Sequence, residues 1–346
     1  MPLTSFLQKF LPRLLVSGVL IGLLLWVALR QPDDSAKDAQ LLQHESLMMG
    51  TLVSITVFLD DHTPREKAEA VVSTLEQLLR QFDQRWSAWS DGDLGAINHE
   101  LIRQHPQNIP PALQALFTQA QRANLLSVGR FDVRIGALVK LWGFDDASHY
   151  LTHPPSKLEI EKILASKTLQ YDFGAIAKGY AADLANALLK KEGLVNAIVN
   201  LGGNLRVSGQ RGERDWNIGI RHPRPDQGTR ILASLKTHGD EAVMTSGDYE
   251  RYFEYQGRRY HHILDPKTGE PAQGLQSVTV VFPEGAWADA ASTALFVAGP
   301  QNWRDVAARM GISQAMVVDA QGQVTVTQAL ASRLQFAEGI RPVVVP

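Results

Sequence analysis

The 346-residue sequence contains no cysteine. This absence excludes disulfides, a thiolate nucleophile, zinc sites built on thiolates and lipid attachment through cysteine. It leaves the compartment open, because both oxidising and reducing surroundings tolerate such a chain.

The sequence also lacks an excess of charge of one sign. Its 34 Lys and Arg residues are scattered and are balanced by 36 Asp and Glu residues, for a formal net charge of −2. A nucleic-acid-binding protein would usually show a basic patch, so this function class is disfavoured. Since 45% of the residues are hydrophobic, the chain can bury a substantial core as one large domain or two small ones.

One long uncharged apolar run stands at the N-terminus. Lys9 and Arg13 precede this run, Leu14–Leu29. A basic flank followed by an apolar run is typical of a signal peptide or a signal anchor. The run has 16 residues, short for a membrane span of about 20, and no A-x-A cleavage site follows it. We predict an uncleaved signal anchor, with a cleaved signal as the alternative. The predicted boundaries are 1–30 for the anchor, 31–45 for a linker and 46–340 for a folded domain outside the cytoplasm.

Helical and strand signals alternate without a regular rhythm along the rest of the chain. Val53, Ile55 and Val57 alternate with polar residues, which predicts a half-buried strand over Leu47–Leu59. The ranges predicted as helices are Pro64–Phe82, Pro111–Ala123 and Gly179–Lys190. The ranges predicted as strands are Trp216–Ile220, Ile231–Leu235, Ala242–Thr245 and Ser277–Phe282, with hairpins around Gln256–Gly257 and within 315–327. Because the strands follow no βαβ order, the predicted fold class is α+β.

Two glycine-rich stretches could approach a ligand closely. Gly174 and Gly179 flank a short turn before a helix, where backbone N–H groups and Lys178 would suit a phosphate. A tight turn that needs glycine for steric reasons explains the pattern equally, and the Walker spacing is absent. The pair Gly202–Gly203 lets the backbone approach another group closely, with an ordinary turn as the alternative.

The stretch RRYHHILDPKTGEP carries two adjacent histidines, His261 and His262. On a strand they point to opposite faces, so only one can face a given site. A histidine beside a polar turn is a candidate general base, since its pKa lies near neutrality. A structural role is the common alternative, and nothing nearby completes a zinc site.

The stretch ADAASTALFVAG places hydroxyls and a carboxylate on an otherwise apolar segment. Asp289 and Thr293 are four residues apart, so a helix puts them on one face. One carboxylate and one hydroxyl, together with phosphates and water, can hold Mg²⁺. An Asp near a helix start is also a common cap, so both interpretations stand on this segment alone.

Taken in order, these stretches resemble the ApbE family of flavin transferases. The resemblance spans most of the chain beyond the anchor. The matching segments are Met49–Thr51, Ser87–Trp89, Gly129–Phe144, Asp172–Asp183, Asn200–Asn204, Thr245–Phe253, His261–Pro271 and Ala288–Gly299.

The resemblance implies a single ApbE-like (T-fold-like) catalytic domain behind the anchor. Such enzymes bind FAD with Mg²⁺, attach its FMN half through a phosphoester to a Thr or Ser of a target protein, and release AMP. The target carries a D/S-G-A-T/S-A-T type motif and is often a subunit of a membrane redox complex, which implies a bacterial inner-membrane protein with its catalytic domain in the periplasm. Two alternatives remain: an Mg²⁺-dependent FAD pyrophosphatase that gives FMN and AMP, and a flavin-binding module without chemistry.

The resemblance also assigns roles to individual residues. His262 would be the base that accepts the target hydroxyl's proton. Asp289, Thr293 and the backbone oxygen of Ala175 would hold Mg²⁺. The positions that match FAD-lining residues are Met49, Trp89, Phe131, Asp132, Asp172, Lys178, Leu264 and Ser292. Trp89 stands where the family often has Tyr, and Lys178 where some members carry Glu. Many members attach through a lipidated Cys, so in this chain the helix itself would be the tether.

Overall fold

The computed structural model describes residues 40–103, 109–146, 151–166, 170–225 and 230–346. The chain divides into two units, residues 1–41 and 42–346, and all described elements belong to the second, apart from the first residue of strand β1. The predicted signal anchor lies outside the described residues. Within the described ranges, no helix is both long and apolar enough to cross a membrane.

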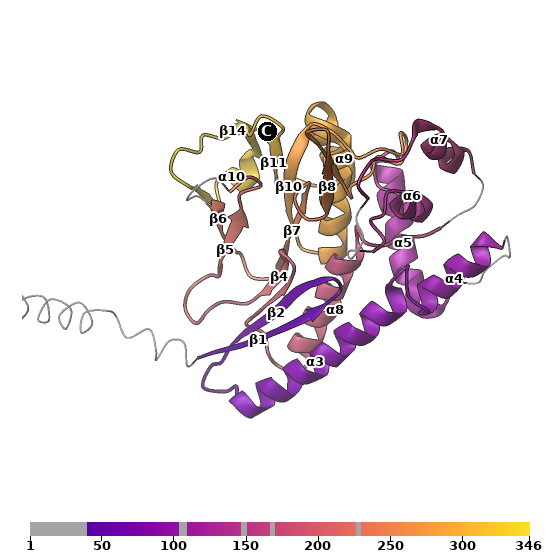
Figure 1. Cartoon of the computed structure of the whole chain (residues 1–346). Coiled ribbons are helices and arrows are strands. Elements are labelled where there is room, and N and C mark those ends of the chain that lie inside the picture. The colour runs from indigo at the N-terminus through magenta and orange to yellow at the C-terminus, as the bar shows by residue number, and fades with distance from the viewer. Residues whose placement is uncertain (1–39, 104–108, 147–150, 167–169, 226–229) are drawn as a thin grey trace, which may run out of the picture. The chain divides into compact units, whose positions relative to one another are not determined.

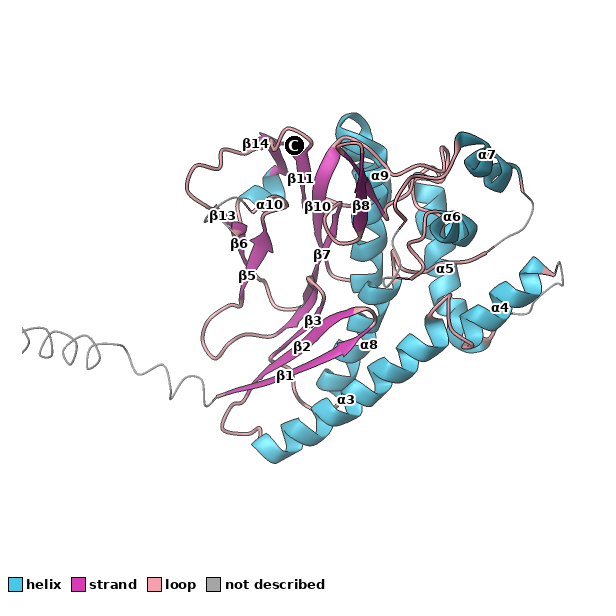
Figure 2. Cartoon of the chain, in the orientation of Figure 1, coloured by secondary structure: helices cyan, strands magenta, loops and turns pink. Residues whose placement is uncertain are grey.

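A nine-stranded sheet forms the centre of the described fold (Figure 1). Its strands, in spatial order, are β1 (Leu41–Met48), β2 (Thr51–Phe58), β3 (Ala197–Leu201), β4 (Asn204–Ser208), β7 (Glu241–Gly247), β10 (Leu275–Phe282), β11 (Ala315–Asp319), β12 (Val324–Thr327) and β14 (Val343–Val345). The registered pairs from β2 to β12 are antiparallel, and β12 pairs with β14 in parallel. Helices α8 and α9 pack against this sheet, and the mixed α+β class predicted from the sequence is confirmed (Figure 2).

The helices lie between the strands along the chain, most of them between β2 and β3. Their bounds are α3 (Arg65–Trp86), α4 (Asp93–Ile102), α5 (Pro111–Leu126), the 3₁₀ turn η1 (Val133–Ile135), α6 (Gly136–Leu141), α7 (Lys157–Ala165), α8 (Ala177–Lys191), α9 (Gly285–Met310) and α10 (Gln328–Ala331). Helix α9 lies against β7 and β10, α8 lies against β3 and β4, and α3 and α5 pack behind α8 and α9 respectively. The predicted helices therefore all form, although α4 and α7 were not predicted.

Two smaller sheets complete the fold. One has the order β13 (Leu334–Phe336), β6 (Ile231–Lys236) and β5 (Asn217–Arg221), and the other is the hairpin of β8 (Tyr252–Tyr255) and β9 (Arg258–His261). The hairpin turns at Gln256 and Gly257, as predicted. Its Phe253 packs with Trp142, Phe144 and Leu264 in an apolar cluster separate from the main core.

The predicted strand Leu47–Leu59 is in fact the second half of a hairpin. Strands β1 and β2 are joined at Met49 and Gly50, whose φ values are 54° and 67°. Two central residues with positive φ define the tight turn that suits the right-handed twist of strands. Because β1 begins at Leu41 and β14 ends at Val345, the folded region extends beyond 46–340 at both ends and takes in the end of the expected linker.

Helices α8 and α9 approach each other with almost no side chain between them. A Cβ atom on Gly179 would lie 2.7 Å from the Cβ of Asp289 and nearer still to the carbonyl oxygen of Gly285. Only glycine allows such a backbone approach. The first half of α9 is buried apart from Thr293, and the helix breaks at Gly299 before Pro300. This contact brings the N-terminal turns of the two helices together.

Candidate active site

The two adjacent histidines face opposite sides of their strand, as the sequence predicts. His261 is buried, its Nε2 lies 2.8 Å from the carbonyl oxygen of Ala272, and its ring packs edge-on against Phe296. Burial lowers the pKa of His261 to about 4. His261 is therefore a neutral structural residue, which leaves His262 as the candidate base.

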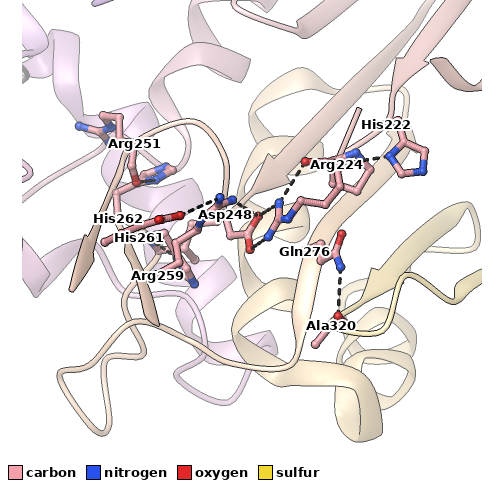
Figure 3. Close-up of polar contacts among 12 residues, drawn as sticks. His222, Arg224, Asp248, Arg251, Arg259, His261, His262, Gln276 and Ala320 are labelled. Atoms are coloured by element: carbon pink, nitrogen blue, oxygen red, sulfur yellow. Dashed lines mark hydrogen bonds and ion pairs between the residues drawn. The ribbon is translucent and has the colours of Figure 1, made fainter. Parts of the chain in front are cut away.

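His262 is held by the backbone of Arg251 (Figure 3). Its main-chain N–H donates to the carbonyl of Arg251 at 3.1 Å, and its ring Nδ1 lies 3.2 Å from the same oxygen. Because a carbonyl can only accept, Nδ1 carries the proton and Nε2 keeps its lone pair. Burial lowers the pKa of His262 well below its ordinary value, with further lowering by the charges of Arg251 and Lys178. The ring is thus a neutral base at neutral pH.

Asp289 reaches across from α9 to α8. Its Oδ2 accepts the backbone N–H of Gly179 at 2.9 Å, and its second oxygen has no hydrogen-bond partner among the described residues. Burial raises the pKa of Asp289, while the charge of Lys178 and the Gly179 amide act in the opposite direction. The side chain is a buried carboxylate that lacks a full counter-charge.

The capping interpretation of Asp289 is wrong for its own helix. Helix α9 starts at Gly285, one turn earlier, and its first amides donate to Asp183 instead: Gly285 N–H at 2.8 Å and Ala286 N–H at 2.9 Å. Each helix therefore contributes a carboxylate to the first turn of the other. Arg206 lies 3.1 Å from Asp183 and balances its charge. The sequence contains Asp183 at the end of a matching segment, but its capping role depends on a contact between helices.

The phosphate interpretation of the glycine-rich turn is not supported by its amides. The N–H of Gly179 is taken by Asp289, and the N–H of Gly174 donates to Asp172 at 2.6 Å. Gly179 is the third residue of α8, so its amide has no acceptor within the helix, and the carbonyl of Ala175, which precedes the helix, has no donor among the described residues. Two oxygens with free lone pairs, on Asp289 and Ala175, thus adjoin the same peptide segment.

Hydroxyl groups line the next turn of α9. Thr293 Oγ1 lies 3.0 Å from Ser246 Oγ of β7, and Ser246 Oγ lies 2.8 Å from Ser292 Oγ. Ser292 also donates to the carbonyl of Asp289 at 2.9 Å and is fully buried. The predicted contact of Ser292 with FAD stays a prediction, since its hydroxyl is already engaged. Ser246 was not singled out in the sequence, although it lies in a matching segment.

Met49 and Trp89 lie at the C-terminal end of α3. The N–H of Met49 donates to Asp83 Oδ2 at 2.8 Å, which holds this residue at its unusual φ. Trp89 follows the helix end with 36% of its surface exposed. A stack of Phe82, Trp86 and Tyr180 joins this end of α3 to α8, beside Gly179. The two predicted flavin-lining residues are therefore partly exposed and close to α8.

Asp132 and Asp172 lie on adjoining segments, because the N–H of Asp172 donates to the carbonyl of Val133 at 2.7 Å. Asp132 forms an ion pair with Arg134 at 2.6 Å. Lys178 contacts the carbonyl of Gly174 at 3.3 Å, and its charge lowers the pKa of both Asp289 and His262. Lys178 thus shares one electrostatic environment with the candidate base and the buried carboxylate.

Phe131 and Leu264 lie inside the protein. Phe131 is 1% exposed and Leu264 is 3% exposed, so both side chains shape the surrounding segments. Their predicted contacts with FAD stay predictions.

Known proteins resemble this chain in sequence and in fold. The model of the ApbE family matches residues 49–317. A protein of Rhodobacter capsulatus named FAD:protein FMN transferase is 32% identical over 315 residues, covering 84% of this chain, which spans 58% of that protein's length. A protein of Treponema pallidum with the same name is 35% identical over 286 residues, covering 73% of this chain and 77% of that protein. The crystal structure of the ApbE protein of Thermotoga maritima superposes with a TM-score of 0.74 at 31% identity, covering 85% of this chain and 99% of that one. The chain belongs to the ApbE family.

Proposed function

We propose that this protein cleaves FAD and transfers the FMN moiety to a Thr or Ser hydroxyl of an acceptor protein, with release of AMP. The names of the relatives support this activity. The observation that carries the proposal is the neutral His262 ring, whose Nδ1 is engaged by Arg251 and whose Nε2 is left to accept a proton. A protein that only binds flavin would have no need of such a base.

The reaction is a displacement at the flavin-side phosphorus of the pyrophosphate. The acceptor oxygen forms the new P–O bond, the bond to the adenylate oxygen breaks, and AMP leaves with the electron pair. The hydroxyl proton passes to Nε2 of His262. The carbonyl of Arg251 then stabilises the imidazolium through the Nδ1–H bond, which orients the ring throughout.

The oxygens near Gly179 fit a divalent cation. The side chain of Asp289 is buried and has one carboxylate oxygen without a partner among the described residues, and Ala175 has an unpaired carbonyl in the adjoining turn. No cluster of three or more His, Asp or Glu side chains able to hold a metal occurs in the described parts of the chain. The site would therefore use one carboxylate, the carbonyl and the hydroxyl of Thr293, with substrate phosphates completing the shell, as Mg²⁺ prefers. Bound there, Mg²⁺ would neutralise charge on the pyrophosphate.

The flavin nucleotide would lie between the end of α3 and the first turn of α8. Met49 and Trp89 offer apolar surface to the ring system, and Lys178 offers a positive charge near the phosphates. Asp132 and Asp172 would supply polar contacts from the adjoining segments.

We also propose the cellular setting. Residues 1–30 would tether the protein to the bacterial inner membrane with the catalytic domain in the periplasm, since Lys9 and Arg13 precede the apolar run. The acceptor would carry the D/S-G-A-T/S-A-T type motif and belong to a membrane redox complex. Protease treatment of spheroplasts tests the orientation: a domain protected until the membrane is lysed would refute it.

The chemical proposal is tested by incubation with FAD, Mg²⁺ and a domain that carries the acceptor motif. Transfer predicts an FMN adduct on the threonine together with AMP. Steady release of AMP and free FMN without an adduct would instead identify a pyrophosphatase, in which water takes the place of the acceptor.

A further inference from the structure

The side chain of Arg251 is a charged group next to the candidate base that the proposed reaction does not use. Arg251 immediately precedes β8, and its carbonyl accepts the main-chain N–H and the ring Nδ1–H of His262 (Figure 3). Its half-buried side chain leads to another part of the chain, where Nη1 donates to the carbonyl of Phe144 at 2.8 Å. Arg251 therefore contacts the base through its backbone and a second segment through its guanidinium.

Phe144 is a fixed anchor for this guanidinium. Its side chain is 1% exposed, and its ring packs on Phe253 with the ring centres 6.1 Å apart. Trp142, two residues earlier, is held as well, because its Nε1 donates to the carbonyl of Gly269 at 2.7 Å. The bond from Arg251 to this segment therefore limits how far the turn before β8 can move.

Arg251, Phe144 and His262 form a closed set of contacts. The ring of His262 bonds to the carbonyl of Arg251, and the guanidinium of Arg251 bonds to the carbonyl of Phe144. The ring of Phe144 lies edge-on to the ring of His262, with the centres 6.4 Å apart. The contact from Nδ1 is the one most easily lost, because its 3.2 Å is the long end of the range for N–H···O bonds, and a further shift of about 0.4 Å would break it. The orientation of the base thus depends on where Arg251 is held.

The charge of Arg251 is not cancelled by a carboxylate. Arg259, on the same hairpin, forms an ion pair with Glu254 at 3.2 Å and lies 3.9 Å from Asp248. Arg251, by contrast, forms no ion pair within the described ranges and bonds to a neutral carbonyl. Its charge is therefore left to act on the neighbouring imidazole.

The charges around His262 keep its ring in the form that accepts a proton. They come from Arg251 in the turn before β8 and from Lys178 on α8, and both are positive, while His261 on the same strand is neutral. Together with burial they lower the pKa of His262 well below its ordinary value. Removal of the charge of Arg251 should raise this pKa, so that the ring becomes protonated, and unable to act as a base, at a higher pH.

We propose that Arg251 is a positioning residue for the base: its guanidinium, bound to the carbonyl of Phe144, fixes the backbone carbonyl that turns Nε2 of His262 towards the acceptor hydroxyl. The proposal rests on the proposed transferase function. Because Arg251 acts through His262, its loss should slow the transfer step and leave FAD binding intact.

The test follows transfer by the full-length protein and its variants, with FAD, Mg²⁺ and the acceptor domain, over the pH range in which histidine titrates. Arg251→Met removes the charge and the hydrogen bond and keeps the aliphatic length. We expect the transfer rate at saturating FAD to fall about tenfold, while the dissociation constant of FAD changes by less than about twofold. The acidic limb of the rate profile should move to higher pH by about half a unit or more.

Two further variants separate positioning from a structural role. Arg251→Lys keeps the charge, so it should leave the acidic limb in place and restore most of the rate. Arg259→Met is the matched control, since it removes a guanidinium from the opposite face of the same hairpin. It should shift neither the acidic limb nor, by more than about twofold, the rate.

A second measurement needs no turnover. Nitrogen NMR of protein with isotope-labelled histidine shows which ring nitrogen carries the proton, and His262→Gln identifies the signal by its loss. We expect the Nδ1–H form in the unaltered protein and a mixture of both tautomers in Arg251→Met. If Arg251→Met does not fold, Arg251→Gln, which removes the charge and keeps an N–H donor, is judged by the shift of the acidic limb.

An unchanged transfer rate and tautomer in Arg251→Met would overturn the proposal, as would a loss of FAD affinity as large as the loss of rate. Equal losses of rate in Arg251→Met and Arg259→Met, without a shift of the acidic limb, would also overturn it, because they indicate a structural role alone. Failure of the transferase function looks different: the unaltered protein gives no FMN adduct. Mixed tautomers in Arg251→Met would then still support the positioning of the ring by Arg251.

Discussion

The contact between α8 and α9 gives a prediction whose size can be worked from the structure. In Gly179→Ala, the new methyl group would lie 2.7 Å from the Cβ of Asp289 and closer to the carbonyl oxygen of Gly285. Neither neighbour can rotate away, since one is backbone and the other is fixed to a buried helix, so overpacking should cost about 3 kcal/mol. Alanine is the better helix former by about 1 kcal/mol. The expected net loss in the free energy of unfolding is about 2 kcal/mol.

Urea denaturation followed by circular dichroism measures this loss. Ala187→Gly, at an exposed position of the same helix, is the matched control and should lose about 1 kcal/mol through helix propensity alone. The separation of the helices should also disturb the bond between Gly179 and Asp289, and with it Mg²⁺-dependent AMP release. If Gly179→Ala instead gains the stability that Ala187→Gly loses, the close helix contact is not what requires glycine, and the reasoning fails.

Four further predictions follow from the site and its supports. Asp289→Asn should weaken the Mg²⁺ dependence of AMP release more than it changes FAD affinity, and an unchanged Mg²⁺ titration would contradict the ligand assignment. Asp183→Ala should lower the free energy of unfolding, measured by urea denaturation, by about 3 kcal/mol, because it leaves Arg206 unpaired and two helix amides uncapped. A loss no larger than that of an exposed substitution would contradict the role of Asp183 as the cap of α9. His261 is neutral in the fold with a pKa of about 4, so the unfolded state binds more protons than the folded state below pH 6.5. The free energy of unfolding should therefore fall by up to about 3 kcal/mol as pH drops towards 4. His261→Gln should flatten this decline, and an identical pH profile in the variant would contradict the assignment of the decline to His261. Met49→Gly should relieve about 1 kcal/mol of backbone strain while weakening FAD binding, and unchanged FAD affinity would remove Met49 from the site.

The sequence predicted local structure where periodicity was clear and failed where distant contacts decide. The helical spacing near Val72 and Leu75 and the turn at Gly257 led to correct elements. The turn at Met49 was missed because methionine rarely adopts positive φ, and here it is bound by Asp83 from another element. Helix α7 was missed although Ser156 and Glu159 form a capping box that the sequence displays.

The residues of the candidate site were found through the ordered motifs, but the contacts between them were not. Sequence spacing put Asp289 and Thr293 on one helix face, yet gave no means of knowing that Asp289 would bind the amide of Gly179 while Asp183 caps α9. The glycine-rich turn looked suited to phosphate because the sequence does not show that Asp289, on another helix, accepts the amide of Gly179. Burial of Phe131 and Ser292 likewise depends on packing that no local pattern displays.

The central claim is that His262 is the base of a flavin transfer. The most direct measurement compares the unaltered protein with His262→Ala, recording FAD binding by quenching of flavin fluorescence and covalent transfer to the acceptor domain by intact mass in the presence of Mg²⁺. The account predicts that the unaltered protein yields the FMN adduct, and that His262→Ala binds FAD nearly as well while its transfer rate falls by a factor of about 100 or more. Transfer at an undiminished rate in His262→Ala would contradict it.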